Sequence, residues 1–97
     1  MSQTDIFRGV ETTAIHSDGI ILGIYRGTTV ASKKGNSITL QTGGWRSRTT
    51  KTRMNQFSNN FVDRSFGVFQ LKGAWFVVLR RSGTVLPFFS DSITFEV

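Results

Sequence analysis

The sequence predicts an α+β fold that is mainly β, with about seven short antiparallel strands and one central helix near residues 50–61. Two observations predict this fold. Short runs of β-branched and aromatic residues are separated by glycine-containing turns along most of the chain. Residues 50–61 interrupt them with apolar side chains at helical spacing. We therefore expect a bent sheet or a small barrel, with the helix covering one side.

Two predicted hairpins precede the helix. The Asp-Gly pair at residues 18–19 lies between the β-prone runs TTAIH and IILGIY and is a strong signal for a tight turn. The run KKG, Lys33–Gly35, separates TTVAS from NSITLQT and predicts the turn of a second hairpin. Gly43 and Gly44 let the backbone adopt positive φ, so we expect them to end the strand before them.

The helix is predicted from Met54, Phe57 and Phe61, whose spacings of three and four residues place them on one helical face. Thr49 or Thr50 is expected to supply the oxygen that caps the first turn. The polar residues expected on the opposite face are Lys51, Asn55, Ser58 and Asn59. Asparagine and threonine are poor helix formers, so packing has to hold this helix together.

The last third of the sequence predicts a meander of three antiparallel strands, FGVFQL, AWFVVLR and TVLPFF. Turns at Lys72-Gly73 and Ser82-Gly83 join them. Pro87 has no N–H donor, so its strand is expected at a sheet edge or at a bulge. Trp75 alternates with apolar residues and is assigned to the core. The final run, ITFEV, predicts one more strand with its apolar side chains pointing inward.

Length and composition limit what the protein can be. The 97 residues predict a single domain, 1–97, in which residues 1–9 are expected to be loose. The chain has no cysteine and one histidine, which excludes disulfides and thiolate metal sites. Its few carboxylates are scattered, so we expect no enzyme activity, no cofactor and no metal. The longest apolar runs are too short to span a bilayer, so no membrane partner is expected.

The net charge of +6 is unevenly distributed along the chain. No acidic residue occurs between Asp18 and Asp63. The basic residues of that interval are Arg26, Lys33, Lys34, Arg46, Arg48, Lys51 and Arg53. A long stretch of one sign creates a field that attracts polyanions.

The segment GGWRSRTTKTRMNQF, residues 43–57, concentrates this charge at the predicted helix start. The positive end of the helix dipole repels cations placed there unless an anion is bound. The residues predicted to form an anion-binding or nucleic-acid-binding site are Trp45, Arg46, Arg48, Thr49, Thr50, Lys51, Arg53 and Asn55. The cations and hydroxyls would contact phosphates, while the indole and the amide would be available to bases. Alternatively, the indole belongs to the core or its rim and the arginines extend into water.

The segment NSITLQTGGWRSRTTKTRMNQF, with the later GAWFVV and LPF, resembles small bacteriophage proteins of unassigned function. Those proteins share Gly-Gly-Trp, then Thr-Thr-Lys, then Arg-Met-Asn. The matching positions here are Gly43, Gly44, Trp45, Thr49, Thr50, Lys51, Arg53, Met54 and Asn55. The resemblance implies a phage gene product that acts in the host bacterial cytoplasm or is carried in the virion. It brings no chemistry with it.

The sequence therefore favours a non-enzymatic, small basic phage protein that binds nucleic acid, DNA or RNA, through residues 45–55. The alternative is a modulator, or inhibitor, that binds an acidic host protein through the same basic surface and the edge strand near Pro87. A structural component of the virion is a third interpretation. Self-association into a homo-oligomer is compatible with all three.

Overall fold

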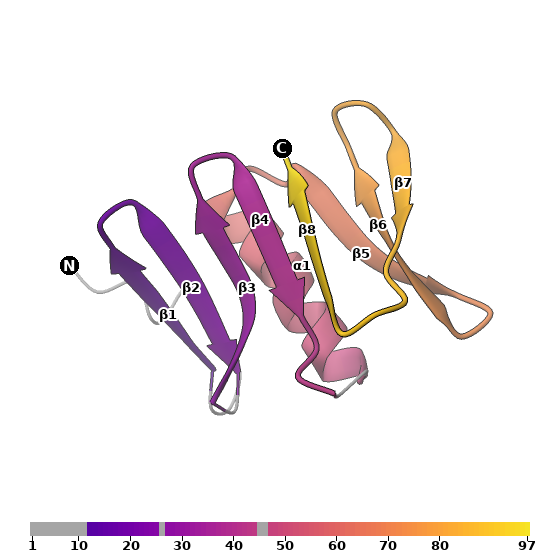
Figure 1. Cartoon of the computed structure of the whole chain (residues 1–97), viewed down its shortest axis with the longest axis horizontal. Coiled ribbons are helices and arrows are strands. Elements are labelled where there is room, and N and C mark those ends of the chain that lie inside the picture. Colours follow the sequence, from indigo (N-terminus) through magenta and orange to yellow (C-terminus); the bar gives the residue numbers. More distant parts are fainter. Residues whose placement is uncertain (1–11, 26, 45–46) are drawn as a thin grey trace.

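A computed structural model describes residues 12–25, 27–44 and 47–97, so the expectation that residues 1–9 are loose lies outside the described residues. The described residues form two antiparallel sheets and one helix (Figure 1). The elements are β1 (Thr12–Ser17), β2 (Ile20–Tyr25), β3 (Thr28–Lys34), β4 (Ser37–Gln41), α1 (Arg48–Phe61), β5 (Phe66–Leu71), β6 (Ala74–Leu79), β7 (Thr84–Pro87) and β8 (Ser92–Glu96). The predicted class, α+β and mainly β with one central helix, is confirmed.

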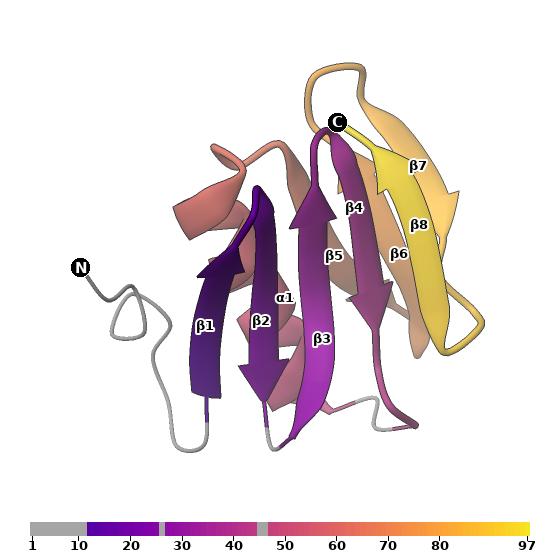
Figure 2. The same cartoon turned by 60° about the vertical axis from the view of Figure 1, so that its left-hand side comes forward.

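The strands divide into a five-stranded sheet with order β1-β2-β3-β4-β8 and a three-stranded sheet with order β5-β6-β7. Figure 2 shows the five-stranded sheet from one side, with α1 behind it. In the described part of the chain the strands number eight rather than about seven, and they do not close into a barrel. Each β-prone run named from the sequence forms one strand, and β2 and β3 are joined by a tight turn that pairs Tyr25 with Thr28.

Turn chemistry explains most of the strand boundaries. Asp18 and Gly19 both have positive φ, 50° and 76°, and form the two-residue turn predicted between β1 and β2. The second hairpin turns at residues 35–36 instead of Lys33–Gly35, because Lys34 pairs with Ser37 and both lysines belong to β3. Gly35, with φ 62°, suits the first position of a two-residue turn. The turn therefore lies closer to the C-terminus than the sequence predicts.

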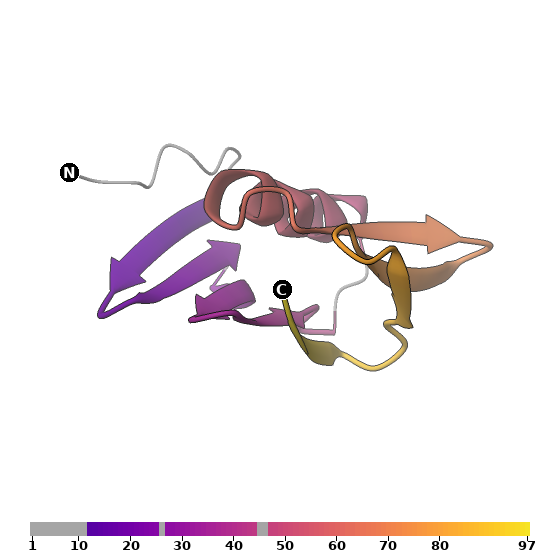
Figure 3. The same cartoon turned by 90° about the horizontal axis from the view of Figure 1, so that it is seen from above.

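Helix α1 lies over one face of the five-stranded sheet, with β5 beside it (Figure 3). Met54 and Phe57 are fully buried, as the helical spacing predicts. The helix begins at Arg48 because Ser47 caps it, its Oγ accepting a hydrogen bond from the N–H of Thr50 at 3.1 Å. The prediction that Thr49 or Thr50 supplies the cap is wrong, since both lie inside the helix.

The core lies between α1, the five-stranded sheet and the inner face of the three-stranded sheet. The rings of Phe66 and Phe95 meet edge to face at a centroid distance of 5.3 Å and join the two sheets. Trp75 is buried as predicted, and Pro87 lies on the edge strand β7 as predicted. Strand β8 pairs with β4, and its Thr94 and Glu96 side chains are exposed while Phe95 is buried, in agreement with the predicted alternation.

The outer edge of β5 is closed by side chains of α1 rather than by another strand. Asn55 donates from Nδ2 to the carbonyl of Val68 at 2.9 Å, and its Oδ1 accepts from the N–H of Val68 at 2.7 Å. Ser58 Oγ likewise donates to the carbonyl of Phe66 at 2.6 Å and accepts from its N–H at 3.2 Å. Ser58 is therefore buried, and its predicted place on the helix face opposite the apolar residues is wrong.

Candidate functional site

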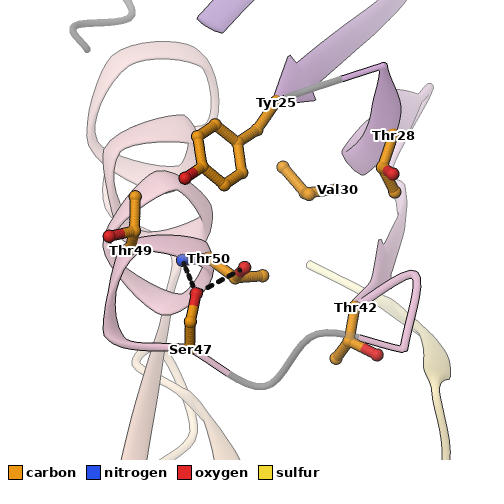
Figure 4. A pocket seen from close by; sticks show the side chains of 7 residues that line it. All are labelled: Tyr25, Thr28, Val30, Thr42, Ser47, Thr49 and Thr50. Atoms are coloured by element: carbon orange, nitrogen blue, oxygen red, sulfur yellow. Dashed lines mark hydrogen bonds between the residues drawn. The ribbon is translucent and has the colours of Figure 1, made fainter. Parts of the chain in front are cut away.

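A pocket of about 530 Å³ opens at the start of α1 (Figure 4). This volume lies within the range of about 300–1,000 Å³ that is usual for small-molecule sites. The lining residues are Tyr25, Thr28, Val30, Thr42, Ser47, Thr49 and Thr50. Most of them carry a hydroxyl group, so the wall offers many uncharged hydrogen-bonding groups to a ligand.

The wall between β4 and the helix is fixed by a short glycine turn. Gly43 and Gly44 have φ values of 64° and 86°, and β4 ends before them as predicted. A Cβ on Gly43 would lie 2.7 Å from Cγ2 of Thr28, so the close approach of the two segments requires glycine. Thr42 is buried, and its N–H donates to the carbonyl of Asp91 at 2.8 Å. This tie holds the turn against the segment before β8.

The first turn of α1 is basic. It contains no acidic residue, while Arg48 is exposed and Lys51 is half-buried. The Ser47 hydroxyl accepts from the N–H of Thr50 and is hydrogen-bonded to the Thr50 hydroxyl at 3.0 Å (Figure 4). A helix N-terminus carries a partial positive charge of about one half, which adds to the cations beside it. The electrostatic conflict predicted from the sequence is therefore present in the fold.

The structure separates the predicted cations instead of gathering them into one cluster. Lys51 faces the three-stranded sheet, with Nζ 3.3 Å from Oε1 of Gln70 and 5.9 Å from the ring centroid of Trp75. Arg53 faces the five-stranded sheet, with its guanidinium carbon 5.6 Å from the ring centroid of Tyr25. The two side chains lie on opposite flanks of the helix.

Arg53 has an unpaired hydrogen-bond donor on the flank of α1 that faces Tyr25. Its Nη1 donates to Oε1 of Gln56 at 3.1 Å, and its Nε is buried with no hydrogen-bond partner among the described residues. The ring of Tyr25 that it covers lines the pocket. A buried guanidinium nitrogen without an acceptor is costly to the fold.

The other predicted site residues have different surroundings. Thr49 lines the pocket and is half-buried, whereas Thr50 is buried behind the cap. Both the Nδ2 and the Oδ1 of Asn55 are hydrogen-bonded to the backbone of Val68 in β5, so this side chain has a structural role. Trp45 and Arg46 lie outside the described residues.

Sequence reasoning missed five residues of the pocket wall: Tyr25, Thr28, Val30, Thr42 and Ser47. Ser47 caps the helix, and the others come from the end of β2, from β3 and from the residue after β4. Only strand pairing brings these segments to the helix start, so no spacing along the chain marks them together. The close approach of Gly43 to Thr28 is the contact that a sequence pattern could not reveal.

The described part of the chain contains neither a metal-binding cluster nor a membrane-spanning helix. There, no three or more histidine, aspartate or glutamate residues lie together as a metal site would require. No helix of that part is long and apolar enough to cross a membrane. His16 is exposed and its ring meets that of Phe61 edge to face at 5.2 Å.

The fold and the pocket define a small, β-rich protein whose described residues include one central helix that begins with a basic turn. The chain belongs to the Kyanoviridae Gp96 protein family, whose model matches residues 2–95. It is therefore a bacteriophage protein, as the resemblance implied. The match extends over nearly the whole chain and does not single out the Gly-Gly-Trp motif, which stays a prediction. No curated protein and no solved structure matches this chain.

Proposed function

We propose that this phage protein binds nucleic acid without catalysing a reaction, in the cytoplasm of the infected bacterium. Phosphates would contact the start of α1, where Arg48 is exposed and the helix dipole points its positive end outward. The observation that carries the proposal is the acid-free, basic first turn beside a pocket lined with hydroxyl groups. Phosphate oxygens are the usual partners of such a combination in nucleic-acid interfaces.

The charges around the pocket favour one of its sides. Asp91 accepts a hydrogen bond from Oγ1 of Thr42 at 3.3 Å, so a carboxylate borders the wall next to β4. A phosphate would be repelled there and attracted to the opposite wall, which Ser47 and Thr49 form. An anion at a helix start gains about 0.3–1 kcal/mol from the dipole alone, and more when partly buried. The phosphate is therefore assigned to the Thr49 side.

Basic side chains on the two sides of α1 would extend the contact along the bound nucleic acid. Arg53, whose guanidinium lies over Tyr25, would add positive charge on the flank next to the five-stranded sheet. Lys51 would add charge on the opposite flank of the helix. Contacts of Trp45 and Arg46 remain part of the proposal as the sequence predicts them. Asn55 is not included, because its amide is bonded to β5.

The test is a fluorescence anisotropy titration of labelled single-stranded DNA, duplex DNA and RNA at several salt concentrations. Four phosphate contacts predict a slope of log affinity against log salt of roughly −3 for a single strand. The variant Arg48→Glu should weaken binding about tenfold or more, because it reverses a charge at the helix start. Arg81→Glu is the matched control, because Arg81 is exposed in the β6–β7 loop at the far end of α1.

Three results would overturn the proposal. The wild-type protein could fail to bind any of the three nucleic acids even at low salt. The Arg48→Glu and Arg81→Glu variants could lose affinity equally, which would leave only unspecific attraction by the net charge. A folded wild-type protein could instead bind an acidic host protein in a nuclease-treated lysate while showing no affinity for nucleic acid, which would favour the modulator.

A further inference from the structure

The outer face of the three-stranded sheet is formed almost entirely by apolar residues. Successive side chains of a strand point to opposite faces, so the register of β5, β6 and β7 assigns each residue to a face. The inner face carries buried residues such as Phe66, Val68 and Val77. The outer face carries Gly67, Phe69, Leu71, Ala74, Phe76, Val78, Val85 and Pro87, with Phe89 next to them. The strand residues of this set carry no charged or polar side chain, although the guanidinium of Arg80, from the loop after β6, reaches over Gly67.

Exposure of large apolar side chains is confined to this face. In the described part of the chain four large hydrophobic residues are exposed: Phe69 by 37 %, Leu71 by 59 %, Val85 by 50 % and Phe89 by 67 %. All four lie on the outer face or beside its end. Single exposed apolar residues are ordinary on protein surfaces, but a contiguous group marks an interaction surface.

The aromatic rings of this face are already ordered against each other. Phe69 and Phe76 are stacked at a centroid distance of 5.5 Å, and Phe76 meets Phe89 edge to face at 5.7 Å. The three rings form a ridge that crosses the sheet from β5 to the segment after β7. Because each ring restrains its neighbour, a partner docking here would lose little side-chain entropy on binding.

We propose that this outer face is the interface of a homodimer, in which the three-stranded sheets of two copies pack face to face. The exposed fractions of Phe69 and Phe89 together equal about one whole phenylalanine, or about 200 Å². The remaining residues of the face raise the apolar area to roughly 500 Å² per copy. Two copies would then bury about 1,000 Å², which is near the lower limit for a specific interface and fits a weak, reversible dimer.

The composition of the face favours a second copy over nucleic acid. Homodimer interfaces have apolar centres enriched in aromatic residues, whereas nucleic-acid surfaces are polar and strongly positive. Phe76 lies at the middle of the face on the middle strand, flanked by Phe69 and Pro87 in the register. A two-fold axis over Phe76 therefore sets apolar positions opposite apolar positions, as a symmetric dimer requires. Sheets stacked in this way are about 10 Å apart.

The edge and the rim of the outer face favour packing face to face over pairing edge to edge. Pro87 has no N–H group on the free edge of β7, which discourages pairing edge to edge. The cations lie at the ends of the face: the guanidinium of Arg80 covers Gly67, and Lys72 occupies the β5–β6 turn. Two copies would bring these like charges near each other at the rim. Added salt should screen them and strengthen the dimer, whereas salt weakens binding to nucleic acid.

The experiment is sedimentation equilibrium of the full chain, freed of nucleic acid, over a wide range of protein concentration and at low and high salt. We expect a reversible monomer–dimer equilibrium that is tighter at high salt. The variants Val85→Lys and Phe89→Lys should each raise the dissociation constant about tenfold or more, because each would bury a charge in the interface. Thr84→Lys is the matched control: it adds the same charge on the same strand, on the opposite face.

A wild-type chain that stays monomeric at every concentration would overturn the proposal. A dimer that Val85→Lys and Phe89→Lys leave intact would do so as well, since the interface would then lie elsewhere. Circular dichroism of the variants shows whether the fold is retained. Because nucleic acid is absent from this experiment, its outcome is independent of the function proposed above.

Discussion

Two regions of α1, the flank next to β5 and the start of the helix, carry polar side chains that have different roles. On the flank next to β5, Asn55 and Ser58 are hydrogen-bonded to the strand backbone and close its edge. At the helix start, Thr49 lines a pocket and Arg48 is exposed. The difference teaches that the task of a polar helix residue depends on what lies beside it. Beside a strand with an unpaired edge, the polar side chain is hydrogen-bonded to the strand backbone and stabilises the fold. Beside an open pocket, the polar side chain stays available to a ligand.

The largest effect is expected from Ser58→Ala, which breaks the closed flank. The substitution leaves the buried N–H and carbonyl of Phe66 without a partner. Each unpaired buried group costs about 1–3 kcal/mol, so the free energy of unfolding should fall by about 2–4 kcal/mol. Urea denaturation measures this change. Asn59→Ala, at an exposed position of the same helix, should stay within about 0.5 kcal/mol, and an equal loss in both would contradict the role given to Ser58.

A smaller loss is expected from Asn55→Ala, because this side chain is only partly buried and water can replace part of its bonding. The free energy of unfolding should fall by about 1–3 kcal/mol in the same urea experiment. The affinity of the folded variant for single-stranded nucleic acid should remain that of the wild type. If affinity fell while stability did not, the amide would be a base-contacting group and the comparison of the two flanks would fail.

The smallest effect on stability is expected at the open start of the helix. Thr49→Val preserves the shape of the side chain and removes one hydroxyl from the pocket wall. We expect a change in stability within about 0.5 kcal/mol and a loss of nucleic-acid affinity of about two- to tenfold, the equivalent of one hydrogen bond. Thr52→Val is the same substitution at an exposed position one turn along the helix and should change neither quantity. Equal affinities for the two variants in anisotropy titrations would remove Thr49 from the proposed contact.

Local chemistry explains which parts of the fold the sequence could predict. The Asp18-Gly19 and Lys72-Gly73 turns depend on residues that accept positive φ, and such residues are visible in the sequence. The helix is visible because Met54 and Phe57 repeat at its period. The predicted cap is wrong because serine and threonine can both cap a helix, and three candidates, Ser47, Thr49 and Thr50, stand within four residues.

The remainder depends on contacts between distant segments. Ser58 looks like a surface residue on a helical wheel, and it is buried because β5 runs alongside the helix. The pocket needs Tyr25 and Thr42 from separate strands, which no spacing along the chain relates. Of the predicted cations, Lys51 and Arg53 are near neighbours in sequence, yet the helix turns them to opposite sides.

The position of β8 next to β4 has a consequence for synthesis on the ribosome. Strand β4 is complete at Gln41, but its neighbour begins only at Ser92, after α1 and the three-stranded sheet. At about 5–20 residues per second, the edge of β4 stays unpaired for a few seconds while the segment between them is made. An open edge is a template for pairing with other chains, so the nascent protein is most exposed to aggregation during that interval. The interval ends when β8 is synthesised and pairs with β4.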